Sequence, residues 1–174
     1  MGCRFCATAQ GGYTRNLTAG EIVDQLMHLQ RLSERQISHV VLMGMGEPLL
    51  NLENAIAALR LMHDELGISY RRITVSTVGI VPKIYTLAEY DLPITLAISL
   101  HAPDDETRAR IMPVNRKWGV DALIQAARDY FEKAIAIDPG YGRANAALAR
   151  IRSAVTLKGE QGASATCTMA KRSR

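Results

Sequence analysis

The chain has 174 residues, which is long enough for one domain with a sizeable core, and its 48% hydrophobic and 22% charged residues exclude an extended disordered chain. The net charge of +4 permits a nucleic-acid partner but does not require one. No apolar run approaches the roughly 18 residues of a membrane span and no secretory signal pattern opens the chain, so we expect a cytoplasmic protein with no membrane partner.

The first part of the chain is predicted to alternate helices with strands. Thr18 and Glu21 have the spacing of a capping box, which predicts a helix over 19–35. The short apolar run at 39–43 is typical of a buried parallel strand. A second helical pattern follows at 52–66.

The same alternation continues beyond this point. Residues 73–78 are rich in β-branched side chains and predict a strand, and 94–100 predict another. Pro82 is expected to open a short helix, and a longer helix is expected over 120–136. This order predicts βαβ units with a parallel sheet. Three strands cannot close a barrel, so the predicted fold class is α/β with a partial (β/α) barrel over 1–125.

The character of the sequence changes after this core. Residues 126–157 have the spacing of the second helix and turn of a tetratricopeptide repeat, although two ordinary amphipathic helices broken at Pro139 remain an alternative. The residues that carry this spacing are Ala127, Phe131, Ala134 and Pro139. The final stretch, 158–174, is small, polar and basic and is predicted to be a disordered tail.

The chain contains three cysteines, Cys3, Cys6 and Cys167. An odd number argues against the disulfide framework of a small secreted protein. Cys3 and Cys6 form a C-x-x-C pair, which in a reducing compartment indicates a metal site or a redox site. The pair alone does not separate a structural zinc site from a redox pair.

Longer motifs give the C-x-x-C pair a context. They are MGCRFCAT at 1–8, the run from Cys6 to Ile22, LMGMGEPLLN at 42–51, RRITVSTVG at 71–79, AISLHAP at 97–103 and RIMPVNRK at 110–117. Together they resemble a family of radical S-adenosylmethionine (SAM) enzymes, the dual-specificity methyltransferases that modify C2 of an adenosine in 23S rRNA and tRNA. The resemblance covers about residues 1–130, and the basic side chains of 110–117 suit either RNA phosphate or a solvated surface.

The resemblance implies two cofactors, a [4Fe–4S] cluster and SAM. The family holds the cluster with C-x3-C-x2-C, in which Cys3 and Cys6 match the second and third cysteines as metal ligands. The first cysteine would lie four positions before Cys3. The implied SAM-contacting residues are Gly46, Glu47, Ser76, Ser99, Leu100 and His101. No catalytic residue is assigned.

The resemblance also implies partners and an activity. In this family a cysteine accepts a methyl group from one SAM, and a radical generated from a second SAM activates that group for transfer to RNA. The implied partners are 23S rRNA, tRNA and an external electron donor, and a monomer is expected. Cys167 does not match the context of the methyl-carrying cysteine. We therefore expect a fragment that lacks N-terminal and C-terminal parts of the family and does not methylate RNA alone.

Other interpretations remain open at this point. The sister family, which methylates C8 of the same adenosine, shares the motifs at 42–51 and 99–103. A non-enzymatic alternative is a helical interaction module over 126–155. A pseudo-protein without any activity is the third.

Overall fold

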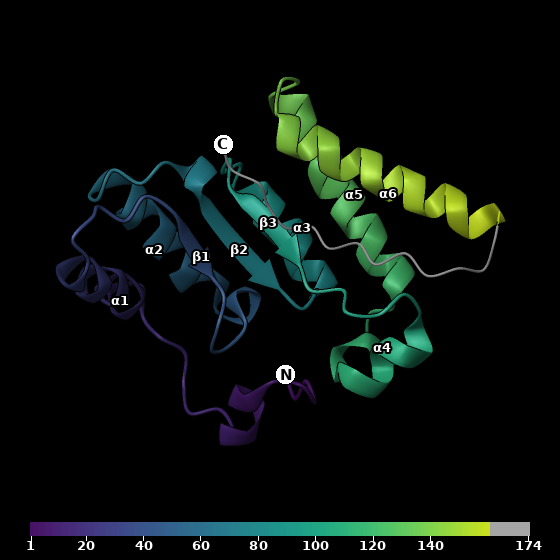
Figure 1. Cartoon of the computed structure of the whole chain (residues 1–174), viewed down its shortest axis with the longest axis horizontal. Coiled ribbons are helices and arrows are strands. Elements are labelled where there is room, and N and C mark those ends of the chain that lie inside the picture. The colour runs from purple at the N-terminus through teal and green to yellow at the C-terminus, as the bar shows by residue number, and fades with distance from the viewer. Residues whose placement is uncertain (161–174) are drawn as a thin grey trace.

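Three parallel strands form the centre of the fold (Figure 1). The computed structural model describes residues 1–160, of which 153–160 are described by their backbone alone. The strands lie in the order β1 (Val40–Leu42), β2 (Ile73–Thr77) and β3 (Thr95–Ile98). Val40 pairs with Ile73, and Thr74 pairs with Thr95. A helical crossover joins each strand to the next, as parallel pairing requires. The predicted α/β class with a parallel sheet is confirmed.

Six α-helices accompany the sheet in the described residues. They are α1 (Ala19–Leu32), α2 (Leu52–Asp64), α3 (Val81–Glu89), α4 (Asp105–Ile111), α5 (Val120–Ile137) and α6 (Gly142–Glu160). Short 3-10 turns lie at Ala7–Gly11, Pro48–Asn51, Tyr70–Arg72 and Pro113–Arg116. The helices expected at 19–35, 52–66, after Pro82 and at 120–136 are all present, whereas α4 was not predicted.

Local sequence signals explain where several helices begin. The predicted capping box opens α1, because the Glu21 backbone N–H donates to Thr18 Oγ1 at 3.3 Å and the Thr18 N–H donates to Glu21 Oε2 at 2.9 Å. Pro82 occupies the first turn of α3, where its missing N–H costs nothing. Asp104 caps α4 by accepting the Thr107 N–H at 2.8 Å.

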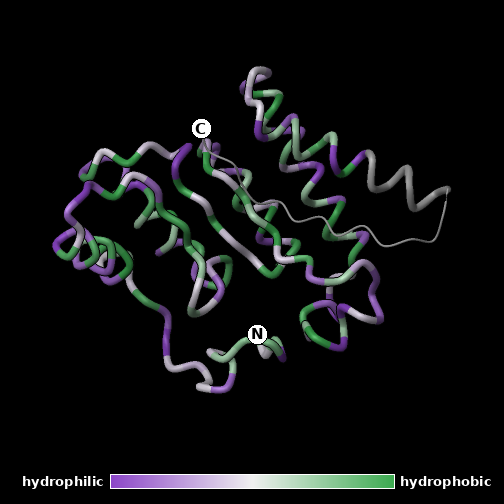
Figure 2. The backbone as a smooth tube through the Cα atoms, viewed as in Figure 1, coloured by the Kyte–Doolittle hydropathy of each residue, from purple (hydrophilic) through white to green (hydrophobic). Residues whose placement is uncertain are grey.

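The hydrophobic core lies between one face of the sheet and the helices. In Figure 1, α2 and α3 lie behind the strands, while α1 and α5 flank them. Figure 2 shows hydrophobic and hydrophilic stretches alternating along these helices, as amphipathic helices require. Ile73, Leu59 and Ile84 are fully buried in this core. The opposite face is covered less, since Thr74 is half-buried and Val41 is 41% exposed.

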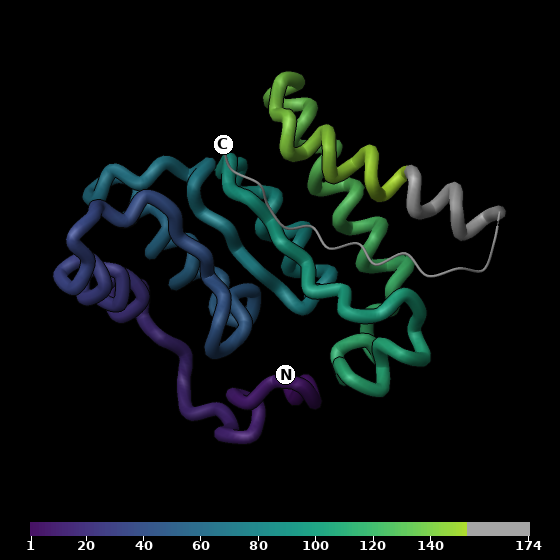
Figure 3. The backbone as a smooth tube through the Cα atoms, viewed as in Figure 1, coloured from purple at the N-terminus to yellow at the C-terminus, as the bar shows by residue number. Residues whose placement is uncertain are grey.

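Helices α5 and α6 form a hairpin, and its turn lies against the amino end of the sheet (Figure 3). Arg71 pairs with Asp138 at 2.8 Å, and Arg143 Nη1 donates to the Arg71 carbonyl at 3.0 Å and to Thr95 Oγ1 at 3.1 Å. Two helices are one hairpin, and a repeat assignment needs stacking with further units, so the tetratricopeptide interpretation stays a prediction. From residue 161 onward the predicted tail, with Cys167, lies outside the described residues.

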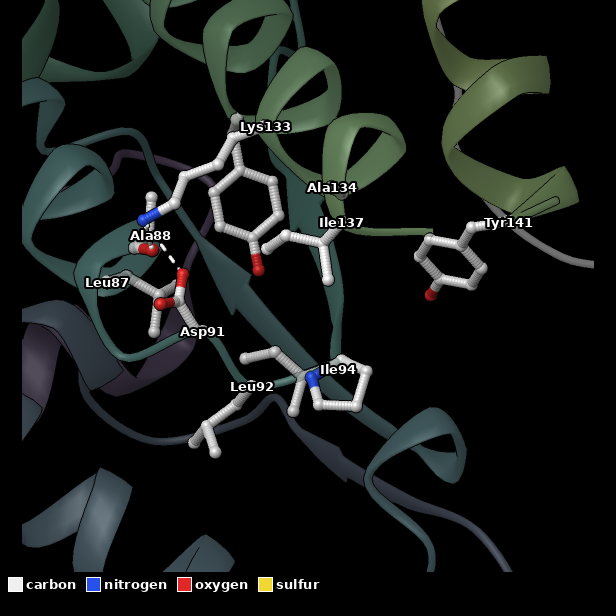
Figure 4. Close-up of a pocket in the computed structure, with 11 residues that line it drawn as sticks. Leu87, Ala88, Asp91, Leu92, Ile94, Lys133, Ala134, Ile137 and Tyr141 are labelled. Carbon is white, nitrogen blue, oxygen red and sulfur yellow. Dashed lines mark hydrogen bonds and ion pairs between the residues drawn. The ribbon is translucent and has the colours of Figure 1, made fainter. Parts of the chain in front are cut away.

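A small pocket lies between α3, the start of β3 and α5 (Figure 4). Apolar side chains line most of it, including Leu87, Ile94 and Ile137. Lys133 and Asp91 form an ion pair at 2.8 Å on one side. This pocket adjoins the amino end of β3, so it is separate from the site at the carboxyl ends. Within residues 1–160, no helix combines the length and the apolar character that crossing a membrane requires.

Candidate functional site

The carboxyl ends of β2 and β3 bring two predicted site residues together. Ser76 pairs in register with Ala97, and the Ser99 N–H donates to the Thr77 carbonyl at 2.9 Å. Because side chains alternate along a strand, Ser99 returns to the face that Ala97 and Ser76 share. Neither serine hydroxyl has a hydrogen-bond partner among the side chains and backbone described. Two donors are therefore available at this edge.

Glu47 follows β1, and its carboxylate accepts a hydrogen bond from the chain that follows β2. Its side chain is buried, with Oε1 accepting the Leu49 N–H at 3.2 Å and Oε2 accepting the Val78 N–H at 2.9 Å. Burial raises the pKa of Glu47, while the hydrogen bonds from Val78 and Thr77 act in the opposite direction. Gly46 precedes it with a φ of +91°, which permits the sharp entry into the motif. A carboxylate has about four acceptor positions, so Glu47 keeps capacity for a ligand.

Leu100 and His101 follow β3 at the same end. His101 has a φ of +59°, a left-handed conformation that is uncommon for residues other than glycine. Its imidazole lies against the Phe5 ring, with centroids 4.6 Å apart. The Ala102 N–H donates to the Leu100 carbonyl at 2.8 Å and closes the tight turn. Backbone strain of this kind concentrates at ligand-binding sites.

The N-terminal loop carries both predicted metal ligands to this end of the sheet (Figure 1). The Cys6 N–H donates to the Cys3 carbonyl at 3.1 Å, which folds the two free thiols into one turn. Cys3 is buried against Met112 and Val114, and this burial raises its pKa. A hydrogen bond from the Ala9 N–H lowers the pKa of Cys6, which favours its thiolate.

Two thiols alone do not complete a metal site. Among the residues that the structure describes, no three His, Cys, Asp or Glu side chains gather as a ligand set. Cys3 and Cys6 nevertheless supply soft sulfur donors, which suit iron–sulfur ligation. They fit a cluster as two of its ligands, and they do not fit it as a complete set.

The sequence did not predict the burial of Arg108, which lies beside the carboxyl ends of β2 and β3. Arg108 in α4 is 0% exposed, and its guanidinium donates to the Val78 carbonyl at 2.6 Å, the Leu100 carbonyl at 3.0 Å and Asn115 Oδ1 at 2.7 Å. The only advance signal was its position beside the motif at 110–117. An arginine in a charged helix is ordinarily solvent-exposed, so its burial was not expected.

The sequence and the fold both match known proteins. The family model described as the radical SAM superfamily matches residues 1–146. This chain belongs to the radical SAM superfamily. A "Probable dual-specificity RNA methyltransferase RlmN" of Symbiobacterium thermophilum is 57% identical over 137 residues, which is 76% of this chain and 37% of that protein. Its counterpart in Carboxydothermus hydrogenoformans is 52% identical over 135 residues, 76% of this chain and 40% of that protein.

A solved structure gives the same assignment. The crystal structure of a radical SAM methyltransferase from Sphaerobacter thermophilus aligns with a TM-score of 0.73 and 44% identity, covering 76% of this chain and 40% of that one. The chain thus spans about two fifths of the length of these relatives. The radical SAM superfamily implies a [4Fe–4S] cluster and SAM as cofactors, so the expected radical SAM assignment and its cofactors are confirmed.

Proposed function

We propose that this chain carries part of the cofactor site of a radical SAM methyltransferase that modifies C2 of an adenosine in 23S rRNA and tRNA. One observation carries the proposal. Two free thiols lie at the same end of a parallel sheet as Glu47, Ser76 and Ser99. The RNA substrates come from the relatives, which are named as dual-specificity RNA methyltransferases.

The residues have separate roles in this proposal. Cys3 and Cys6 would hold two irons of the cluster. Gly46 and Glu47 would receive the ammonium of SAM, because a glycine backbone allows close approach and a carboxylate accepts charge-assisted hydrogen bonds.

The remaining contacts lie on β2 and β3. The hydroxyls of Ser76 and Ser99 are available to the polar groups of SAM, and His101 and Leu100 line the same edge. With both groups bound and an external electron donor present, the cluster and SAM together supply one-electron chemistry.

We also infer that the sheet is part of a (β/α) barrel. Its half-exposed face, with Thr74 and Val41, is the face that a barrel would enclose. The functional residues follow the carboxyl ends of the strands, where parallel barrels place their sites. The non-enzymatic alternative, a helical interaction module over 126–155, predicts that this segment, expressed separately, binds a peptide partner or stacks with copies of itself.

Cluster binding tests the metal assignment. This chain should take up substoichiometric, labile iron on anaerobic reconstitution, because Cys3 and Cys6 supply two thiolates where the motif uses three. A full-length family member, as the positive control, should hold stoichiometric iron, and Cys3→Ser or Cys6→Ser should remove the labile iron from this chain. Stable, stoichiometric iron in residues 1–174 with Cys167 dispensable would contradict the assignment.

RNA methylation tests the substrate. A full-length family member, with SAM and a reductant, is the positive control and should transfer a methyl group to 23S rRNA fragments and to tRNA, whereas this chain should give no turnover above background. Nucleotide mapping of any product from this chain decides the position, and a methyl group on C8 would move the chain to the sister family. Turnover by residues 1–174 alone would show that two motif thiolates suffice.

A further inference from the structure

The pocket at the amino end of β3 encloses a cavity of about 50 Å³ that opens to solvent on one side (Figure 4). Its walls come from three elements, with Leu87 from α3, Ile94 next to β3 and Ile137 from α5. An apolar cavity of roughly 150 Å³ holds a benzene ring, so this cavity can enclose only a smaller group. Because its walls are aliphatic, a small branched aliphatic group such as isobutyl suits it.

The hydroxyl of Tyr130 is a polar group without a partner in this pocket. Tyr130 lines the pocket from α5 and is only 9% exposed, and its hydroxyl makes no hydrogen bond with the residues that the structure describes. Within that part of the chain, Arg128 Nε is the one side-chain nitrogen or oxygen that is both sealed from solvent and unpaired. Solvent therefore still reaches the Tyr130 hydroxyl, and the pocket is the hollow that this side chain lines. Burial raises the pKa of Tyr130, so its hydroxyl is a protonated donor at neutral pH.

An ion pair beside the pocket favours a neutral ligand. Lys133 Nζ pairs with Asp91 Oδ1 at 2.8 Å and also donates to the Ala88 carbonyl, as Figure 4 shows for the ion pair. The two charges already compensate each other, so a charged ligand would lose its hydration without finding a free counter-charge. A carboxylate has more acceptor positions than one ammonium uses, so Asp91 can still accept an N–H. The pocket thus combines an aliphatic wall with one free donor and one acceptor.

We propose that this pocket is a binding site for a small neutral amide that carries a branched aliphatic group. The aliphatic group fills the cavity, the amide carbonyl accepts the Tyr130 hydroxyl, and the amide N–H donates to Asp91. A neutral amide satisfies both polar groups without placing a third charge beside the ion pair. The site adjoins the amino end of β3, whereas Glu47 and Ser76 lie at the carboxyl ends of the strands, so this proposal does not depend on the proposed function.

The test uses isovaleramide as the probe and isovalerate as its charged counterpart, because the two share one carbon skeleton. The full chain, isotope-labelled, is titrated with each compound and followed by the chemical shifts of its backbone amides. Isovaleramide should shift the amides of Asp91 and Ile94 in a saturable way, and isovalerate should bind at least about tenfold more weakly. No saturable shift with isovaleramide, or equal affinity for isovalerate, would overturn the proposal.

Tyr130→Phe removes the hydroxyl and keeps the ring. Because the hydroxyl has no partner in the free protein, the urea midpoint of unfolding should not fall, whereas the affinity for isovaleramide should drop about fivefold. Tyr70→Phe is the matched control, since Tyr70 is half-buried, stacks on His63 and does not line the pocket. An unchanged affinity in Tyr130→Phe, a lower midpoint or loss of folding in that variant, or an equal loss of affinity in Tyr70→Phe would each count against the proposal and overturn it.

Ile137→Trp tests the location of the site from an exposed position. Ile137 is 62% exposed, so the substitution should leave the fold intact, and the larger indole should block the pocket and abolish the saturable shifts. Leu32→Trp, at an 85% exposed position of α1, is the matched control and should bind isovaleramide as the wild type does. Binding that survives Ile137→Trp would place isovaleramide elsewhere on the protein and overturn the proposal.

Discussion

Gly79 directly follows Val78, whose backbone hydrogen-bonds to both Glu47 and Arg108. The substitution Gly79→Ala should destabilise the protein strongly. The φ of Gly79 is +97°, and an added Cβ would lie 2.5 Å from Leu123 Cδ1 and 2.8 Å from Cδ2. Left-handed backbone costs about 1–2 kcal/mol for a residue with a side chain. Overpacking a well-packed core adds about 1–3 kcal/mol. The free energy of unfolding, measured in urea, should therefore fall by about 2–5 kcal/mol.

Two controls separate the backbone effect from the packing effect. Gly46 has a similar φ of +91° but no atom within 4 Å of an added Cβ, so Gly46→Ala should show the backbone cost alone. Leu123→Ala should cost about 2–5 kcal/mol in the wild type but less in Gly79→Ala, because it removes the clashing methyl groups. Equal losses in the two glycine variants, or simple additivity with Leu123→Ala, would refute the packing argument.

Three other substitutions test the core and the electrostatics. Leu59→Ala, at a fully buried position of α2, should lower the free energy of unfolding by about 2–5 kcal/mol in urea, whereas the same change at Leu32, which is 85% exposed, should stay within about 0.5 kcal/mol. Burial raises the pKa of Glu47 in the folded state above its ordinary value of 4.5. The wild type should therefore lose stability as the pH rises above 4.5. Glu47→Gln should remove this loss, as measured by unfolding curves across a pH series. Glu21 affects stability in the opposite direction, because its hydrogen bonds with Arg15 lower its pKa to about 2. Glu21 therefore stabilises the folded state above pH 4.5, and this stabilisation is lost as the pH falls towards 2. Glu21→Gln should reduce the loss of stability at acid pH in the same series of unfolding curves.

Much of the fold could be predicted because local signals and long-range packing agree. The β-branched run at 73–78 became the central strand, since both of its neighbours pair with it and its side chains fill the core. The capping box at Thr18 and Glu21 formed because it uses groups only three residues apart. The parallel order followed from the alternation of strands with helices.

The site contains features that periodicity cannot reveal. The strand predicted at 94–100 ends at Ile98, because the Leu100 carbonyl is turned towards Arg108 and His101 adopts a left-handed backbone. The helix predicted to reach residue 35 ends at Leu32, where Ser33 is already extended. Helix α4 carries too many charges to show an apolar stripe, so neither it nor the burial of Arg108 could be inferred from the pattern.

The backbone of Val78 joins the acidic and the basic residues of the candidate site. Its N–H donates to Glu47 Oε2 at 2.9 Å, and its carbonyl accepts from Arg108 Nη2 at 2.6 Å. Glu47, which follows β1, and Arg108, in α4, therefore fix the N–H and the carbonyl of Val78 at the end of β2. Displacing either one should move the other, although their side chains come from distant parts of the sequence.

This arrangement predicts that Glu47 and Arg108 are energetically coupled. In a double-mutant cycle with Glu47→Gln and Arg108→Lys, the losses in SAM affinity should be non-additive by about 0.5–3 kcal/mol, because the first substitution already loosens the residue that the second would release. Titration calorimetry with SAM measures the four affinities. Arg110→Lys, at the exposed position of the same helix, should be additive with Glu47→Gln. Additive losses for Glu47 and Arg108 as well would mean that Val78 does not transmit strain between them, and that the two residues act on SAM independently.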